Sequence, residues 1–423
     1  MIFLDLDDRK TTIIEQERQN LHESLLPNYQ KRDDDIPKTT NIGWLKNYFQ
    51  EDDDKDYFPS NSKYEKFMTF SPHGNLFQQR EELENAVFLA YFLNRTLVIP
   101  PIILGLNIEF INPQELRQKL NTLRADKLES ECSIKEVTKP ERKETKYEID
   151  LNCLNEFDSY SLLRWDSLFN LDFIKQNIHI LHRRDFDQVK LEKMLNVTNS
   201  KLNVCEFKIS SLNSIHSHKE KLLSFDCLSG KGLIDKDSPQ DQLYWDMIDN
   251  SLTLNNPVVL DVSKKIVQKL GGKGNYVGVH ARFLSTSNSK KFIQKSFTRL
   301  TLALKNYFND IPQDLKGTSN DLCKLDFIPS SRVIYLATDL SRNDAILSSF
   351  LSKFPCVLIL SDFKKILHPL LELYNPRDGT LLFKFLEPLV NSQIASSGME
   401  LFSVGDDTYS AYTKQLHKDT NNV

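Results

Sequence analysis

The sequence lacks any long hydrophobic run, any excess of positive charge and any clustering of its few cysteines. Its longest apolar stretches are well short of the roughly 20 residues that a membrane span needs, so we expect no span, and neither a signal peptide nor an anchor is evident. A net charge of -4, without a basic stripe that carries interleaved aromatic residues, predicts no nucleic-acid partner. These absences favour an ordinary globular protein.

The 6 cysteines form no CxxC pair, and no histidine lies beside them at the spacing of zinc ligands. We therefore expect no metal site. An even number of cysteines permits several disulfide pairings, among which the sequence does not choose. Two glycosylation sequons, at Asn94 and Asn196, matter only in a chain that enters the secretory pathway. Asn94 adjoins a predicted core helix, so we expect no glycan there.

The length of 423 residues favours two domains. Residues 1–60 are polar with acidic runs, and so little apolar surface cannot offset the entropy of ordering, so we expect an extended or partly disordered arm. We place a first Rossmann-like domain over residues 61–250, with a charged insertion over 105–150 in which Gln114–Glu148 is predicted to be exposed and helical. A second Rossmann-like domain follows over residues 251–423.

The first domain opens with the order strand, loop, helix and strand. A strand is predicted over Met68–Phe70, a turn over Ser71–Gly74, and a helix from about Arg80. The second half of this helix is apolar on every side, which indicates burial inside an α/β layer. A second strand follows over Thr96–Ile99, and the two prolines after it end the strand.

The loop His73-Gly74-Asn75 lies between this first strand and its helix. Parallel βαβ units bind ligands at the carboxyl ends of their strands, and backbone amides at a helix N-terminus attract anions. The loop is therefore the first candidate site. A glycine at the start of a helix is also common without a ligand, and the pattern does not decide between these interpretations.

The second domain shows a regular alternation of strands and helices, which predicts a parallel, doubly wound sheet. The predicted strands cover residues 276–279, 333–337, 356–360 and 401–404, and predicted helices include residues 341–354, 381–393 and 408–417. Two α/β domains with loops at their strand ends predict a substrate cleft between them. Many nucleotide-sugar transferases have this architecture.

Two charged side chains, His280 and Arg282, follow the first strand of the second domain and share a face because side chains alternate along a strand. A guanidinium presents fixed donors that match a phosphate, and it stays charged at any working pH. If a glycosyl bond to a diphosphate breaks, Arg282 would stabilise the negative charge that grows on the leaving group. The alternative is that Arg282 pairs with a structural carboxylate.

Asp339 ends the next strand. Its carboxylate there would accept hydrogen bonds from a guanine edge or from ribose hydroxyls. Alternatively, it caps the helix that is predicted to begin at Ser341.

In the last loop, Thr408 and Ser410 offer hydroxyls and backbone amides to a phosphate. The neighbouring Asp406 and Asp407 would repel a pyrophosphate unless they are compensated, and one of them could instead cap the following helix.

Four segments of this chain, taken together and in order, resemble a fungal member of the GDP-fucose protein O-fucosyltransferase superfamily over about residues 66–415. They are PHGNLFQQR with ENAVFLAYFLNRTLVIPP, then YVGVHAR, then YLATD, then GDDTYSAY. The resemblance implies a GT-B-like α/β fold, with two Rossmann-type doubly wound domains facing a central cleft. It implies a glycosyltransferase that moves fucose from GDP-fucose to a hydroxyl acceptor, such as Ser or Thr of a protein or a glycan, with inversion and without a metal or cofactor. It also implies the lumen of the endoplasmic reticulum or Golgi.

The resemblance assigns roles to the candidate residues. Arg282 would be the catalytic residue that holds the β-phosphate and the glycosidic oxygen. His280 and Asp339 would contact the nucleoside, while Thr408 and Ser410 would bind phosphate oxygens. The expected substrate-binding residues of the first loop are Gly74, Asn75 and Gln78.

The first loop also departs from the family pattern. Gln78 occupies the place of an asparagine that touches the sugar, so it keeps the amide but adds a methylene. Asn75 stands where some members carry an acidic general base, and an amide cannot take a proton at neutral pH. Two alternatives therefore stay open: a catalytically impaired member that binds a nucleotide or a glycan, and a transferase for another nucleotide sugar. The acceptor cannot be read from the sequence.

Overall fold

The computed structural model describes residues 65–105, 108, 112–123, 134–138, 145–149, 159–197, 200–203, 215, 218–226, 228–230, 233–235, 238–283, 290–310, 333–354, 356–405 and 408–421. All of these belong to the compact unit Phe49–Val423, the second of two into which the chain divides. The arm predicted over residues 1–60 and the pair Asp406–Asp407 lie outside the described residues. None of the described helices is long and apolar enough to cross a membrane.

The N-terminal half, defined here as residues 65–251, is built on a five-stranded sheet in the order β7-β2-β1-β9-β8, with every neighbouring pair parallel. Its strands are β1 (Phe67–Phe70), β2 (Thr96–Ile99), β7 (Ile180–His182), β8 (Ser200–Asn203) and β9 (Leu222–Phe225). Its helices are α3 (Leu76–Leu93), α4 (Pro113–Asn121), α6 (Asp172–Asn177), α7 (Gln188–Met194) and α9 (Pro239–Ser251), with a 3-10 turn η2 (Trp165–Ser167).

Helix α3 begins at Leu76, about four residues before the predicted start at Arg80. The reason is a capping box: the Asn75 side chain accepts hydrogen bonds from the backbone N–H groups of Phe77 and Gln78, and the Gln78 side chain accepts one from the Asn75 backbone. The helix ends at Asn94, whose φ of 46° is the left-handed conformation common at a helix end. Asn94 is exposed, although Arg95 and Thr96 beside it are buried, so its side chain is accessible despite adjoining the core.

The insertion over residues 105–150 is not uniformly helical, which corrects the prediction. After α4, strands β4 (Ile134–Thr138) and β5 (Thr145–Ile149) pair as an antiparallel ribbon. A second antiparallel pair joins β3 (Ile102–Leu104) to β6 (Ser161–Leu163). Pairing between strands depends on residues far apart in the sequence, and the run of Lys and Glu that suggested a helix does not report it.

The C-terminal half, defined here as residues 257–421, carries a four-stranded parallel sheet in the order β12-β11-β10-β13. Its strands are β10 (Val277–Ala281), β11 (Ile334–Thr338), β12 (Val357–Leu358) and β13 (Glu400–Val404). Its helices are α10 (Pro257–Lys269), α11 (Lys290–Asp310), α12 (Ala345–Leu351), α13 (Lys364–Leu371), α14 (Phe383–Ser396) and α15 (Thr408–Asn421), with a 3-10 turn η4 (Leu360–Phe363). The α/β class with parallel sheets is thus confirmed.

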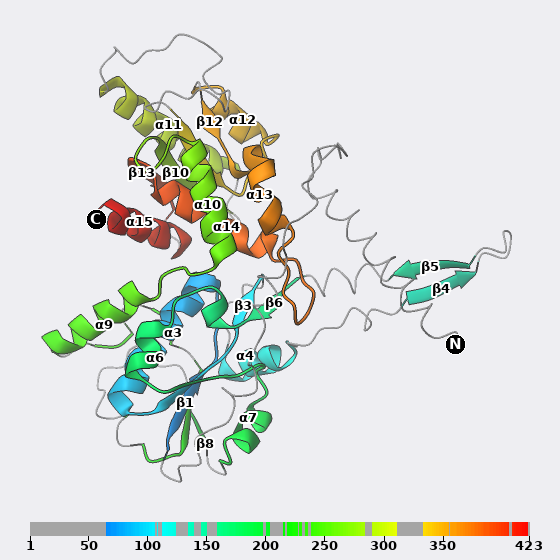
Figure 1. The fold of residues 1–423 in the computed structure, drawn as a ribbon, viewed down its shortest axis with the longest axis vertical. Helices are drawn as coiled ribbons and strands as arrows, with labels where there is room; N and C mark the ends of the chain where they lie inside the picture. The colour runs from blue at the N-terminus through cyan, green and yellow to red at the C-terminus, as the bar shows by residue number, and fades with distance from the viewer. Residues whose placement is uncertain are drawn as a thin grey trace. The chain divides into compact units, whose positions relative to one another are not determined.

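The two faces of this sheet contact different helices. Alternate residues of β10, such as Val277 and Val279, join a core with α11 and α12. On the other face α14 lies against β10 and β11, and α10 packs beside it (Figure 1). Gly278 makes the close approach possible: a Cβ at this position would lie 1.9 Å from the carbonyl oxygen of Ala395. Helix α14 therefore rests directly on the backbone of β10.

Candidate functional site

The predicted site residues of the C-terminal half gather at one edge of its sheet. Arg282 follows β10, Asp339 follows β11, and α15 begins at Thr408 soon after β13. Since β10 pairs in parallel with both β11 and β13, the carboxyl ends of these three strands meet. This is the edge at which α/β sheets bind ligands.

Arg282 is half-buried at this edge, and its guanidinium carbon lies 4.9 Å from the centre of the Tyr409 ring. Asp339 holds the backbone just beyond the arginine: both of its carboxylate oxygens accept from the N–H of Phe283, at 3.1 and 2.9 Å. The cap of α12 is Asp344, so the alternative that Asp339 caps this helix is wrong. The carboxylate of Asp339 instead fixes the turn that carries Arg282.

Glu387 of α14 was not singled out from the sequence. Burial raises the pKa of its carboxyl, the charge of Arg282 opposes that shift, and the charge of Asp339 adds to it. Glu387 therefore lies within electrostatic reach of both predicted site residues. The signal that could have found it is an acid in the first turns of the predicted helix 381–393, which enters at this edge of the sheet.

His280 is fully buried, and its Nδ1 lies 3.3 Å from the Ser410 hydroxyl. Both His280 and Arg282 contact α15, as expected for alternate residues of one strand. The histidine thus fixes the first turn of α15 against β10. Direct contact of His280 with a nucleoside stays a prediction.

The first loop meets α15 directly. The Asn75 amide donates to the Thr408 hydroxyl at 3.0 Å, and that hydroxyl donates to the Asn75 carbonyl oxygen at 3.1 Å. Gly74 adopts φ of +73°, and its N–H donates to the carbonyl of Ile108 at 2.6 Å. The carbonyl oxygen of Gln78 accepts from the Asn75 backbone at 2.9 Å, so this part of the amide serves the helix cap. The structure therefore brings the predicted residues of the first and last loops together.

The third member of the loop, His73, has a structural partner. Its ring Nδ1 forms a close contact with the Glu82 carboxylate, which also accepts from the His73 backbone at 3.0 Å. Burial raises the pKa of Glu82, and the hydrogen bonds and charge of His73 oppose the shift. This pair holds the loop His73-Gly74-Asn75 against α3.

A second carboxylate missed from the sequence lies at the carboxyl edge of the N-terminal sheet. Asp226 follows β9, next to Ser71 at the end of β1. Arg117 donates to both of its oxygens at 3.1 Å. Burial raises the pKa of Asp226 to about 6, and the charge of Arg117 and the hydrogen bond of Ser71 oppose the shift.

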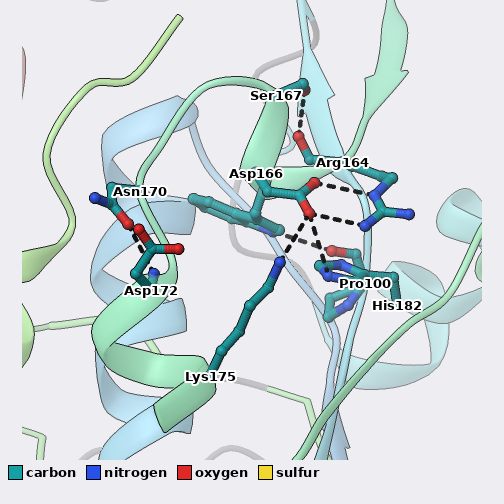
Figure 2. A network of polar contacts seen from close by, with 9 residues as sticks. Pro100, Arg164, Asp166, Ser167, Asn170, Asp172, Lys175 and His182 are labelled. Atoms are coloured by element: carbon teal, nitrogen blue, oxygen red, sulfur yellow. Dashed lines mark hydrogen bonds and ion pairs between the residues drawn. The ribbon is translucent and has the colours of Figure 1, made fainter. Parts of the chain in front are cut away.

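A charged network lies around Asp166 in η2, where Arg164, Lys175 and His182 converge on one carboxylate (Figure 2). Burial works against ionisation of Asp166, but the hydrogen bonds of Arg164 and the charges of His182, Arg164 and Lys175 hold its pKa well below the usual range. The indole of Trp165 donates to Pro100 at 3.0 Å. These contacts tie η2 to the ends of β2 and β7.

Within the part of the chain that the structure describes, no group of three or more His, Cys, Asp or Glu side chains could hold a metal ion. The expectation of a metal-independent reaction stays a prediction.

The fold and this edge define an α/β protein whose charged and hydroxyl side chains gather at the carboxyl ends of parallel strands. The model of the family described as GDP-fucose protein O-fucosyltransferase matches residues 67–372. The chain therefore belongs to this family, and it is a glycosyltransferase. No curated protein matches the chain by sequence.

Several solved structures are similar to the chain at low identity. POFUT1 in complex with GDP is 11% identical, with a TM-score of 0.38, and the match covers 84% of this chain and 95% of that one. The fucosyltransferase NodZ from Bradyrhizobium is 10% identical, with a TM-score of 0.41, over 83% of this chain and 92% of that one. POFUT1 in complex with GDP-fucose is 10% identical, with a TM-score of 0.40, over 84% and 95%.

Proposed function

We propose that this enzyme transfers fucose from GDP-fucose to a hydroxyl of an acceptor, with Ser or Thr of a protein as the expected acceptor. The observation that carries the proposal is the position of Arg282: a half-buried guanidinium at the carboxyl end of β10, beside the start of α15 and the loop of Asn75. Membership of the family supplies the donor class.

In this reaction the acceptor oxygen forms a bond to the anomeric carbon while the bond from that carbon to the diphosphate oxygen breaks, with inversion. The acceptor hydroxyl releases its proton to water, and negative charge grows on the departing GDP. Arg282 would hold the β-phosphate and the glycosidic oxygen and stabilise this charge more in the transition state than in the ground state. Thr408 and Ser410, in the first turn of α15, would donate to phosphate oxygens. His280 and Asp339 would contact the nucleoside. No metal is assigned a role.

The proposed arrangement is GT-B-like, with residues 61–250 and 251–423 as two Rossmann-like domains whose cleft holds the donor. Gly74, Asn75 and Gln78 would approach the sugar from the first domain. The hydrogen bonds between Asn75 and Thr408 support this, because they join the two loops that would close on a donor.

We place the enzyme in the lumen of the secretory pathway. Cys356 is half of a disulfide, and disulfides persist in oxidising compartments. Both sequon asparagines, Asn94 and Asn196, are exposed. These features suit a lumenal protein.

The test is GDP release from GDP-fucose by the purified full chain, with and without an acceptor peptide rich in Ser and Thr. The wild type is expected to release GDP, and Arg282→Ala to lose most of this activity while still folding. Arg299→Ala is the matched control, because Arg299 is exposed on α11 and is not one of the proposed site residues. Full turnover by Arg282→Ala would refute the role of the arginine.

A second candidate function is binding of the nucleotide or a glycan without turnover. One observation favours it, that the Gln78 side-chain carbonyl serves the helix cap. The resemblance adds a second reason, because Asn75 stands where some members carry an acidic general base. Stabilisation by GDP in a thermal-shift panel, with no GDP release under any acceptor condition, would support this candidate. Stabilisation by a UDP-sugar and none by GDP would indicate a different donor.

A further inference from the structure

A continuous row of rings and cations connects α3 to Arg282. Arg282 lies 4.9 Å from the centre of the Tyr409 ring, and Phe77 meets the same ring edge-on at 4.4 Å. Phe77 also stacks on Tyr412 at 4.2 Å. The guanidinium of Arg80 lies 5.8 Å from the centre of the Tyr412 ring. The row therefore begins in the N-terminal half and ends at the proposed catalytic group.

The end of the row in the N-terminal half is firmly anchored. Phe77 and Tyr412 are only 3% and 9% exposed. Arg80 is paired with Glu84 at 2.5 Å and with Asp249 at 3.2 Å, and it donates to the Asp249 backbone at 2.8 Å. These contacts with Glu84 and Asp249 fix Arg80, so the rings that pack against it have little freedom.

Arg282 is held differently. Among the described residues, no carboxylate pairs with its guanidinium within 4 Å; Glu387 acts on it only as a nearby charge. A long side chain without a bidentate partner keeps several rotamers, and a site that is loose by about 1 Å loses much of its rate. A ring face attracts a guanidinium and restricts where it lies. The Tyr409 ring is thus the contact that selects the position of Arg282.

We propose that Tyr409 is a positioning residue for Arg282, and that Phe77 of α3 fixes the Tyr409 ring. Correct contact between α3 and α15 then places the guanidinium that faces the diphosphate. This inference rests on the proposed function of Arg282. The proposal makes correct packing of α3 against α15 a condition for efficient fucose transfer.

Kinetics of Tyr409 variants test the proposal. Tyr409→Leu removes the ring face and is expected to lower kcat roughly tenfold, with a smaller change in KM for GDP-fucose. Tyr409→Phe keeps the ring and is expected to retain the rate within about threefold. Tyr374→Leu, at an exposed tyrosine 42% accessible to solvent, is the matched control. Equal damage from Leu and Phe would overturn the role of the ring.

A double variant separates positioning from general packing. If Tyr409 acts through Arg282, Tyr409→Leu is expected to cost less than about twofold in an Arg282→Ala background, because the effects of coupled residues do not add. The same tenfold loss in that background would overturn the proposal. If Tyr409→Leu does not fold, Phe77→Leu serves in its place, with the same pattern and a smaller loss.

A readout without turnover keeps the two proposals distinguishable. In arginine-labelled protein, the Nε–H signal of Arg282 is expected to show a ring-current shift, lost in Tyr409→Leu and reduced in Phe77→Leu. A wild type that shows this shift but releases no GDP would contradict the proposed function and support the positioning. An Arg282 signal that does not change in Tyr409→Leu would refute the positioning itself.

Discussion

Two arginines of this protein lie in contrasting surroundings. Arg164 donates to both oxygens of Asp166, in a network that Lys175 and His182 complete (Figure 2). Arg282 lies over a ring, and Glu387 acts on it as a nearby charge. A guanidinium whose donors are spent on a carboxylate stabilises the fold, whereas one held by a ring face keeps its donors for a phosphate. The difference predicts opposite phenotypes for the two positions.

The largest effect is expected from replacing each of these two arginines with alanine. Arg282→Ala should lower kcat roughly 10²–10³-fold, the cost typical of losing one group that stabilises developing charge, with little change in thermal stability. Arg164→Ala should keep kcat and lower the free energy of unfolding by about 2 kcal/mol, because it leaves a partly buried carboxylate short of a partner. Steady-state kinetics and urea unfolding measure both. If Arg282→Ala lost stability without losing rate, the role assigned to Arg282 would be wrong.

The carboxylate at the centre of the network gives a pH test. Because the folded-state pKa of Asp166 is held well below its ordinary value of about 3.9, its ionised form stabilises the fold above about pH 4, and this contribution is lost as the pH falls through the folded pKa. Asp166→Asn should therefore lower stability by about 2 kcal/mol between pH 5 and 8. The deficit should shrink below pH 4. A deficit that is independent of pH would show that the charge is not responsible.

Asn75 should give a smaller effect of a different kind. Asn75→Ala removes the cap of α3 and the contact with Thr408, and we expect a loss of about 1 kcal/mol in the free energy of unfolding. Thr408→Val keeps the cap and removes only the contact between the loops, so it should cost less. If the two variants cost the same, the cap contributes nothing and the contact between halves carries the whole effect.

The smallest effect is expected at Glu387. Its pKa is raised in the folded protein, so stability falls as the pH rises from the ordinary value of about 4.3 through the folded pKa. Glu387→Gln has no such titration, and its melting temperature should change less over that interval. If the melting temperature of Glu387→Gln changed with pH as that of the wild type does, burial would not raise the pKa of Glu387.

The sequence predicted what depends on neighbours along the chain. The strand Thr96–Ile99 was placed at its observed ends because apolar β-branched residues run into two prolines. The start of α3 was missed because the capping box of Asn75 and Gln78 was not recognised. The ribbon β4–β5 was missed because its pairing is a tertiary event.

The residues of the candidate site also divide into those that local patterns predicted and those that depend on tertiary contacts. Arg282, Asp339 and the hydroxyls of α15 were found because each follows a strand of a parallel sheet. Glu387 was missed because it reaches the site from a helix that packs on the sheet, and an acid in the first turns of the predicted helix 381–393 is too common a feature to single it out. The contact of Asn75 with Thr408 joins residues 333 positions apart. Resemblance to a family suggested that both belong to one site, but only coordinates supply the contact.

The absent side chain at Gly278 links several of these features. The backbone of β10 touches the end of α14 there; Arg282 directly follows β10, and Glu387 lies in α14. A larger residue at position 278 would push the end of α14 away from β10. The resulting tilt of the helix would separate Glu387, more than one helical turn away, from Arg282. The charges that surround Arg282 therefore depend on the absence of a side chain at position 278.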